Sequence, residues 1–263
     1  MRTAFLSFLL VYSYSCFAQD KWIPLDLQNR IHLANKQKNH MILAEYFLGK
    51  PYIAFALSPE NPERVYISLE DFDCVTFIEN VMSLYASKGQ DSLYKKNLIY
   101  WRYSNPNDIR FETREHYFTS ALRRMVTEKR LEQVHSPVEV NSKKTFSFLS
   151  NFYRSKNKNI SIPELQHMEQ KLAGQSISYF PTAQVTGILP WLRDGDIITF
   201  VSRRNNLDVQ HTGFIVQKKK NWYLLHASQE AKKVCISEKN LTDYLKSHPS
   251  FLGFQVFRPN FIK

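Results

Sequence analysis

The residue best placed to do chemistry is Cys74, at the predicted start of an amphipathic helix. Asp73 before it is a typical N-cap, and Gly89 is a typical helix end. Apolar side chains follow at the three- and four-residue spacing of a helix; they are Phe77, Ile78, Val81, Met82, Leu84 and Tyr85. A thiol at a helix N-terminus faces unpaired N–H groups and the positive end of the helix dipole, which favour the thiolate. The pattern therefore predicts a cysteine nucleophile.

Two alternatives apply to Cys74. Cysteine is among the most buried residue types, and Cys74 lies on the apolar stripe of its own helix, so inert packing is one of them. The other is a disulfide with Cys235, which an exported chain could form and which would remove the nucleophile. Cys235 lies in an alternating, strand-like segment, and this favours a buried structural thiol.

His211 and His226 are placed to form a general base and its orienting partner. His211 opens one predicted strand and His226 ends the next. If residues 217–220 form a four-residue hairpin loop, the two histidines lie directly opposite each other and share a face. A change of one residue in the loop would separate them. A single strand histidine is more often a surface or core residue, so the pairing carries this hypothesis.

Helices in the first part of the chain and strands in the last third would hold these residues. Helical spacing is present at residues 31–48, 74–88, 118–129 and 163–172, followed by an extended connector at 181–190. Short or alternating apolar runs lie at residues 197–201, 209–217, 222–228 and 252–257. This order predicts an α+β fold in which the nucleophile helix packs on an antiparallel sheet.

The composition limits the class of protein. The chain has 263 residues, of which 43% are hydrophobic, so it can build a substantial core. Its 35 basic and 24 acidic residues give a formal charge of +11. The basic residues are scattered and no nucleic-acid motif accompanies them, so solvated faces explain most of this charge. An anionic polymer or membrane surface is the second interpretation and nucleic acid the third.

The N-terminus predicts export. A short positive start at Met1-Arg2, an apolar stretch over residues 4–14 and a small residue at Ala18 resemble a secretory signal. We expect residues 1–18 to be removed and the protein to reach the periplasm. Lipidation at Cys16 is the alternative. No other stretch approaches the length of a transmembrane helix.

Five segments, in order, resemble the NlpC-type papain-like cysteine hydrolases of bacterial cell-wall metabolism. The closest resemblance is to their N-acetylmuramoyl-L-alanine amidase-like branch. The segments are Gly49-Lys50-Pro51-Tyr52, Asp73–Glu79, Arg114-Glu115-His116-Tyr117-Phe118, Asp194–Ile198, and His211-Thr212-Gly213 with His226-Ala227-Ser228. The resemblance implies a papain-like α+β fold in which residues 19–263 form one catalytic domain with family-specific insertions. We expect this domain to be a monomer.

The resemblance also implies roles for the catalytic residues. Cys74 would be the nucleophile, His211 the general base and His226 the residue that orients it. Tyr52 would place a phenol beside the nucleophile, on the oxyanion or substrate side. The structural alternative for Tyr52 is an ordinary buried tyrosine after a turn.

Arg114, His116 and Tyr117 fall in the segment special to the amidase-like branch and are candidate substrate contacts. The alternative is that this polar run simply begins a surface helix. The chain departs from the family pattern at Phe55, where the pattern has a glycine, and at Thr119-Ser120-Ala121, where we expected an acidic residue and a tryptophan. These departures concern substrate details rather than the nucleophile.

The predicted function is an exported cysteine amidase that cleaves the bond between N-acetylmuramic acid, in its ordinary or anhydro form, and L-alanine. A Cys74 thiolate and a His211 imidazolium would carry the reaction, and N–H groups at the helix start would stabilise the oxyanion. No cofactor is needed. The sequence has neither a His-Glu-x-x-His spacing nor a Cys-x-x-Cys pair for zinc.

Three alternative functions stay open. An endopeptidase that cuts between D-glutamate and the diamino acid of the stem peptide would use the same chemistry. A non-catalytic cell-wall-binding module would keep the fold, although it would not need Cys74, His211 and His226 together. A transferase would pass the thioester to an amine instead of water. In each case we expect peptidoglycan or muropeptides as the partner.

Overall fold

The computed structural model describes residues 22–57, 62–156 and 160–260, and their helices are distributed along the whole chain. The α-helices are α1 (Leu25–Gln37), α2 (Met41–Tyr46), α3 (Cys74–Ser87), α4 (Asp91–Arg102), α5 (Phe118–Thr127), α6 (Phe148–Tyr153), α7 (Ile162–Leu172), α8 (Val185–Ile188) and α9 (Leu241–Lys246). Short 3₁₀ helices are η1 (Phe111–Thr113), η2 (Thr182–Gln184) and η3 (Leu189–Trp191). The predicted signal at 1–18, with Cys16, lies outside the described residues.

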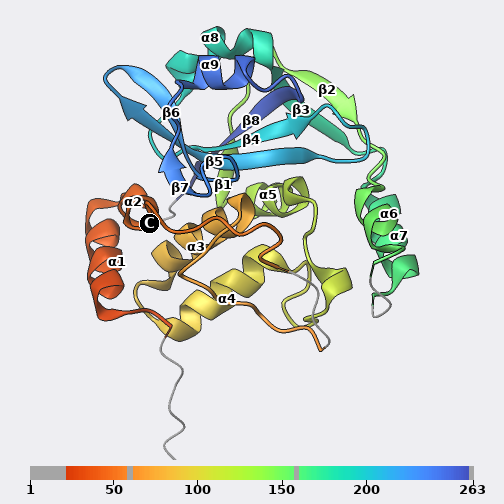
Figure 1. Ribbon diagram of the computed structural model, residues 1–263, viewed down its shortest axis with the longest axis horizontal. Helices are drawn as coiled ribbons and strands as arrows, with labels where there is room; N and C mark the ends of the chain where they lie inside the picture. Colours follow the sequence, from red (N-terminus) through yellow and green to blue (C-terminus); the bar gives the residue numbers. More distant parts are fainter. Residues whose placement is uncertain (1–21, 58–61, 157–159, 261–263) are drawn as a thin grey trace, which may run out of the picture.

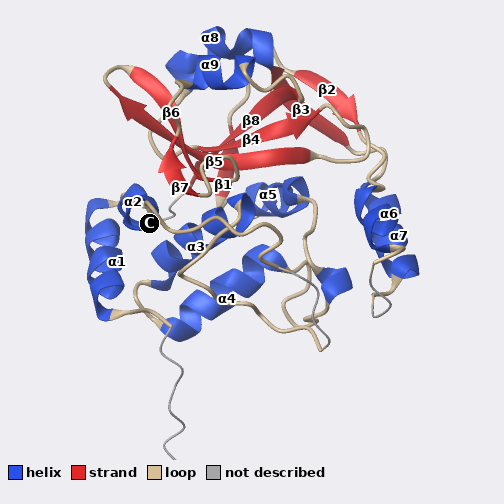
Figure 2. Cartoon of the chain, in the orientation of Figure 1, coloured by secondary structure: helices blue, strands red, loops and turns tan. Residues whose placement is uncertain are grey.

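The strands form one antiparallel sheet in the order β2-β3-β8-β4-β5-β6-β7, and β1 also pairs with β8. They are β1 (Leu131–Gln133), β2 (Val140–Lys143), β3 (Ser176–Pro181), β4 (Ile197–Ser202), β5 (Val209–Lys218), β6 (Asn221–Ser228), β7 (Lys233–Ile236) and β8 (Phe251–Pro259). Helices α1–α5 cover one face and α8 and α9 the other, while α6 and α7 lie beside one end (Figures 1 and 2). The predicted α+β class, with helix α3 on an antiparallel sheet, is confirmed at this level.

Alternation along the strands divides the core into two parts. Phe214 of β5 and Leu225 of β6 belong to the core beneath the sheet, shared with α1–α5. Their neighbours Ile215 and Leu224 belong to the core on the other face, shared with α8 and α9. Because side chains two residues apart share a face, this division also fixes the direction of each functional side chain on β5 and β6.

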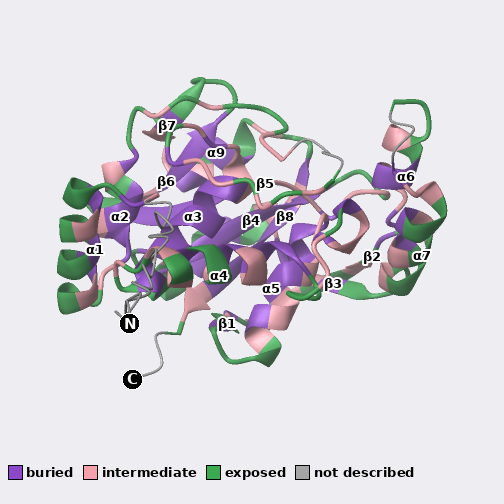
Figure 3. Cartoon of the chain, turned by 90° about the horizontal axis from the view of Figure 1, so that it is seen from below, coloured by how far each residue is buried: buried purple, intermediate pink, exposed green. Residues whose placement is uncertain are grey.

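Helix α3 is buried around nearly all of its surface, because the sheet lies on one side and α4 on the other (Figure 3). Its start is the predicted one. Asp73 Oδ1 accepts hydrogen bonds from the N–H groups of Val75 at 3.0 Å and Thr76 at 2.7 Å, and Thr76 Oγ1 accepts one from the Asp73 N–H at 2.9 Å. This capping box satisfies donors that a helix start leaves open.

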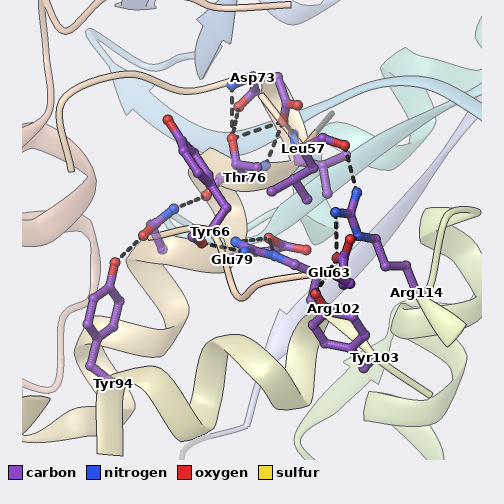
Figure 4. A network of polar contacts seen from close by, with 12 residues as sticks. Leu57, Glu63, Tyr66, Asp73, Thr76, Glu79, Tyr94, Arg102, Tyr103 and Arg114 are labelled. Carbon is purple, nitrogen blue, oxygen red and sulfur yellow. Dashed lines mark hydrogen bonds and ion pairs between the residues drawn. The ribbon is translucent and has the colours of Figure 1, made fainter. Parts of the chain in front are cut away.

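A buried ion pair ties α3 to α4 (Figure 4). Arg102 Nε donates to Glu79 Oε2 at 2.9 Å, and both side chains are almost completely buried. Arg102 Nη1 donates in addition to the carbonyl oxygen of Tyr66 at 2.6 Å. Burial raises the pKa of Glu79 and Arg102 opposes that rise, so the arginine keeps a charged carboxylate tolerable inside the core.

Two predicted segments differ in the structure. The helix predicted over 31–48 is interrupted between α1 and α2, because Lys38 adopts a left-handed backbone with φ 52°. The extended connector predicted at 181–190 is wrong, since most of it is helical. Pro190 lies in the first turn of η3, where its missing N–H breaks no hydrogen bond, so it starts a helix instead of preventing one.

Replacement of Arg102 by methionine should lower the free energy of unfolding by about 3–5 kcal/mol, because Glu79 would be left buried without its partner. Urea denaturation followed by circular dichroism measures this change. The double variant Glu79→Leu/Arg102→Met is the matched control and should recover most of the loss. A single variant as stable as the wild type would contradict the role of the pair.

Candidate active site

The β5–β6 hairpin brings His211 and His226 together on one face of the sheet. Its turn consists of Lys219 and Lys220, with φ angles of 46° and 68°, as is typical of a two-residue type I′ turn. The predicted four-residue loop, with the histidines directly opposite, is therefore wrong by two residues in register. Because that shift is even, both side chains still point to the same face, as diagonal neighbours.

The two imidazoles are hydrogen-bonded to each other. His211 Nε2 and His226 Nδ1 are 2.6 Å apart. Burial lowers the pKa of His211 well below its usual value and that of His226 to about 4, so both rings are neutral at pH 7. If His211 Nε2–H is the donor, its Nδ1 is the unprotonated nitrogen and can accept a proton. Nδ1 is thus the nitrogen that His226 leaves open for chemistry.

Packing holds the histidine pair from several sides. The His211 ring stacks on Phe200 with centroids 6.1 Å apart and an interplanar angle of 9°. The His226 ring lies edge-on to Tyr244 at 5.8 Å. A Cβ added to Gly213 would lie only 2.9 Å from His226 Cβ, so the glycine allows the approach that the sequence suggested. The pair is therefore positioned before any substrate binds.

Cys74 lies where β5 and β6 separate. Their pairing stops at Phe214 on the side toward His211. Thr212 is two residues from Phe214, so its N–H points to the same side of β5, toward β6. It lies beyond the last paired residue of the two strands. This N–H lowers the pKa of Cys74, which places Thr212 next to Sγ. The N-terminus of α3 thus lies against the strand that carries the predicted base.

The pairing of β5 and β6 ends at this point, and α3 contacts both strands. The histidines lie on the α9 face, whereas α3 covers the opposite face. Cys74 nevertheless contributes to the raised pKa of Tyr244, a residue of α9, so its sulfur lies near that face. Among the described residues, the structure shows no hydrogen bond between the Cys74 thiol and His211. A direct contact with the imidazole therefore belongs to the reaction proposed below.

The Cys74 thiol is neutral in the resting protein. Burial and then the adjacent Asp73 carboxyl raise its pKa to about 12, against the N–H groups of Thr212, Cys74 and Val75. This is opposite to the predicted thiolate. Burial is the main cause of the difference, and the capping box adds to it, because Asp73 takes the N–H groups of Val75 and Thr76 and places a carboxyl group beside the sulfur. Cys74 and Cys235 are both free thiols, so the disulfide alternative is not formed.

Tyr52 lies beside the nucleophile. Its N–H donates to the carbonyl oxygen of Lys232 at 3.0 Å, and its backbone bridges to Phe72, two residues before Cys74. Burial raises the pKa of the Tyr52 phenol, with smaller contributions from Cys74 and Asp73. The hydroxyl therefore stays protonated and can donate a hydrogen bond near the sulfur.

Arg114 is almost completely buried and uses its guanidinium within the protein. Its Nε and Nη2 contact Glu63 Oε1 at 2.5 Å, and its Nη1 donates to the carbonyl oxygen of Leu57 at 2.6 Å (Figure 4). These bonds hold the chain that follows Tyr52. The predicted substrate contact of Arg114 stays a prediction, while its contacts in the structure position this neighbouring segment.

His116 and Tyr117 are also bonded to the protein itself. His116 Nε2 donates to the carbonyl oxygen of Phe111 at 2.6 Å. Burial and then Arg114 lower the pKa of His116 to about 3, so its ring is neutral. The Tyr117 hydroxyl donates to Glu169 Oε1 at 2.7 Å. Their role in substrate binding likewise stays a prediction.

Phe55 occupies a backbone conformation that favours glycine, with φ 58°. This accounts for the glycine that the family pattern has here. The Phe55 side chain is 64% exposed and stacks on Phe152 at 5.8 Å, which in turn stacks on Phe148 at 5.7 Å. The departure noted in the sequence thus adds an aromatic column to the loop that follows Tyr52.

A cavity of about 670 Å³ lies beside the histidine pair on the α9 face. His211, His226 and Tyr244 line it, together with Arg203 and Arg204. Within residues 22–57, 62–156 and 160–260, no group of three or more His, Cys, Asp or Glu side chains could hold a metal ion. No helix in those ranges is long and apolar enough to cross a membrane.

Comparison with known proteins gives consistent matches. A family profile described as AmiA-like, N-acetylmuramoyl-L-alanine amidase-like, matches residues 42–253. A solved N-acetylmuramoyl-L-alanine amidase from Bacteroides uniformis ATCC 8492 is 28% identical, with 85% of this chain and 99% of that chain covered and a TM-score of 0.77. A search of curated proteins found no match.

Two further solved structures are similar. One, from Bacteroides fragilis and described as a candidate xylanase, is 29% identical, with 82% of this chain and 98% of that chain covered and a TM-score of 0.75. The other, from Legionella pneumophila, is 19% identical, with 89% and 93% covered and a TM-score of 0.68. At that identity the likeness shows the fold alone.

The raised pKa of Cys74 predicts slow, pH-dependent alkylation. Its rate constant with iodoacetamide should rise about tenfold per pH unit from pH 6 to 9, because the thiolate fraction does so below the pKa. Intact-mass spectrometry measures the rate, and Cys74→Ser corrects for reaction at Cys235. A rate constant that is flat across this range would instead reveal a preformed thiolate–imidazolium pair.

Proposed function

The chain belongs to the N-acetylmuramoyl-L-alanine amidase-like family, and from this premise we propose that it is an exported, periplasmic cysteine amidase. Its substrate would be the amide between N-acetylmuramic acid, ordinary or anhydro, and L-alanine in peptidoglycan or its fragments. Family membership and the Bacteroides uniformis relative support a peptidoglycan amidase in general. We extend this general assignment with three proposals: the cysteine mechanism, the papain-like relationship and export.

One observation carries the mechanistic part of the proposal. Cys74 lies next to Thr212, at the place where the strands of His211 and His226 cease to pair and the two imidazoles are bonded to each other. A thiol, a base with an open nitrogen and an orienting imidazole are thereby gathered in one region. This set has the components of nucleophilic acyl transfer.

The reaction would begin from neutral groups. As Cys74 Sγ attacks the amide carbonyl carbon, its proton passes to His211 Nδ1, and His226 Nδ1 accepts the hydrogen bond from the resulting imidazolium. His211 then gives that proton to the leaving nitrogen, the C–N bond breaks and a thioester remains. Water, deprotonated by His211, attacks the thioester and releases the muramic acid carboxyl group and the thiol.

The oxyanion would be held by two donors from different segments. We expected several N–H groups at the start of α3 to serve, but Asp73 occupies those of Val75 and Thr76. The first donor in this proposal is the Cys74 N–H, which has no oxygen partner among the described residues. The Tyr52 hydroxyl, protonated and close to the sulfur, supplies the second donor in this proposal.

Glycoside hydrolysis fits the region less well. It needs two carboxyl groups on either side of the scissile bond. Of the described residues around Cys74, Asp73 provides a carboxyl group that is already bonded within the capping box. The name given to the Bacteroides fragilis relative therefore does not guide our assignment.

Cys74→Ala should abolish release of the stem peptide from purified muropeptides, because no other described group replaces the thiol. Mass spectrometry of products from wild-type protein and variant tests this. A free sugar and an intact stem peptide identify the amidase, whereas Cys74-dependent cleavage inside the stem identifies the endopeptidase. A ligated product with excess amine would indicate a transferase. Absence of any Cys74-dependent product would favour the binding module.

Tyr52→Phe should lower kcat on a muropeptide by about 10²–10³ with little change in KM, since loss of one oxyanion donor acts on the transition state. Steady-state kinetics separates the two constants. Tyr46→Phe, which removes a phenol hydrogen-bonded to Asp26 on α1, is the matched control and should keep wild-type kcat. A larger change in KM than in kcat would place Tyr52 in substrate binding instead.

A further inference from the structure

Two arginines line the cavity beside the histidine pair, whereas the neighbouring cavity has none. Its volume of about 670 Å³ is within the range of sites that enclose small ligands. Arg203 and Arg204, from the connection between β4 and β5, line it on a side that a neighbouring cavity does not share. Two arginines thus line the same space as His211 and His226.

These arginines are not neutralised by the cavity itself. Arg203 is oriented by two carbonyl oxygens, because its Nε donates to Pro249 at 3.0 Å and its Nη2 to Phe251 at 3.4 Å. The Arg204 side chain makes no hydrogen bond or ion pair with a described residue. Of the described residues lining the cavity, Glu230 alone carries a carboxylate, and it lies 3.5 Å from His248. The Arg204 guanidinium and Nη1 of Arg203 are therefore available to an anionic ligand.

The chemistry of the reaction indicates which part of the substrate enters. His211 must protonate the leaving nitrogen, so the leaving group has to lie on the side of that imidazole. The acyl part would then lie toward Tyr52 and the oxyanion donors. This step rests on the proposed function, in which the leaving group is a stem peptide that begins with L-alanine and carries free carboxylates.

We propose that this cavity binds the stem peptide and that Arg203 and Arg204 hold its carboxylates. Gln210, Ser228 and Gln229 line the same space and offer neutral polar groups to peptide amides. The protein would then distinguish its substrates by their charge on the peptide side of the scissile bond.

A pair of matched substrates tests the proposal. One is a muramyl tetrapeptide with free carboxylates, and the other is the same compound with its D-glutamate and C-terminal carboxyl groups amidated. In the double variant Arg203→Gln/Arg204→Gln, the ratio of kcat/KM between the free and the amidated substrate should fall about tenfold or more, through KM. Arg30→Gln, an exposed arginine of α1, is the control. An unchanged ratio would overturn the proposal.

A binding measurement separates this inference from the proposed function. Free stem tetrapeptide should bind Cys74→Ala protein in a calorimeter about tenfold more tightly than it binds the same protein with both arginines replaced. If it does so while the wild type releases no peptide from muropeptides, the peptide site stands and the amidase assignment fails. Equal affinity, with both proteins showing the same thermal unfolding, would overturn the site whatever the activity.

Discussion

The burial of α3 is the constraint on which the rest of the structure depends. A helix with the sheet on one side and α4 on the other cannot shift without disturbing both layers. Its polar residues must then find partners inside the core, and Glu79 does so with Arg102. The same rigidity fixes the N-terminus of the helix, and with it Cys74, against the edge of β5. Cys74, the proposed nucleophile, is thus positioned by the core and not by a surface loop.

The capping box and the thiol compete for the same helix start. Asp73 begins the helix well, but it takes two N–H groups and places a carboxyl beside the sulfur. A helix N-terminus by itself favours anions, whereas a capped and buried one has less of that effect left. Good helix formation and a preformed thiolate therefore oppose each other in this protein, and the cap adds to the effect of burial on the pKa of Cys74.

Much of the fold could be predicted from local pattern. The start of α3 follows from Asp73 and the apolar spacing after it, and β4, β5 and β6 follow from alternation and short apolar runs. Parity also predicted that His211 and His226 share a face. The register of their hairpin could not be predicted, because left-handed conformations at Lys219 and Lys220 have no strong signal in a run of lysines.

Other features depend on contacts between distant segments. The neutral state of Cys74 results from burial that only the packed sheet creates, and the inward bonds of Arg114 depend on Glu63 and Leu57. The prolines at 181 and 190 resemble connector residues, although both lie at helix starts, where proline is well tolerated. Sequence spacing reports none of these tertiary effects.

The residues of the candidate site come from the first and last thirds of the chain, and this has a consequence for the unfolded protein. Tyr52 and Cys74 come from the first third, whereas Thr212, His211 and His226 come from the last third and must pair before they can meet the sulfur. Contacts of such long sequence separation form late and only together. A nascent or unfolded chain therefore carries every reactive group and yet has no active centre. In the proposed mechanism, completion of the sheet is therefore the step that brings these groups together.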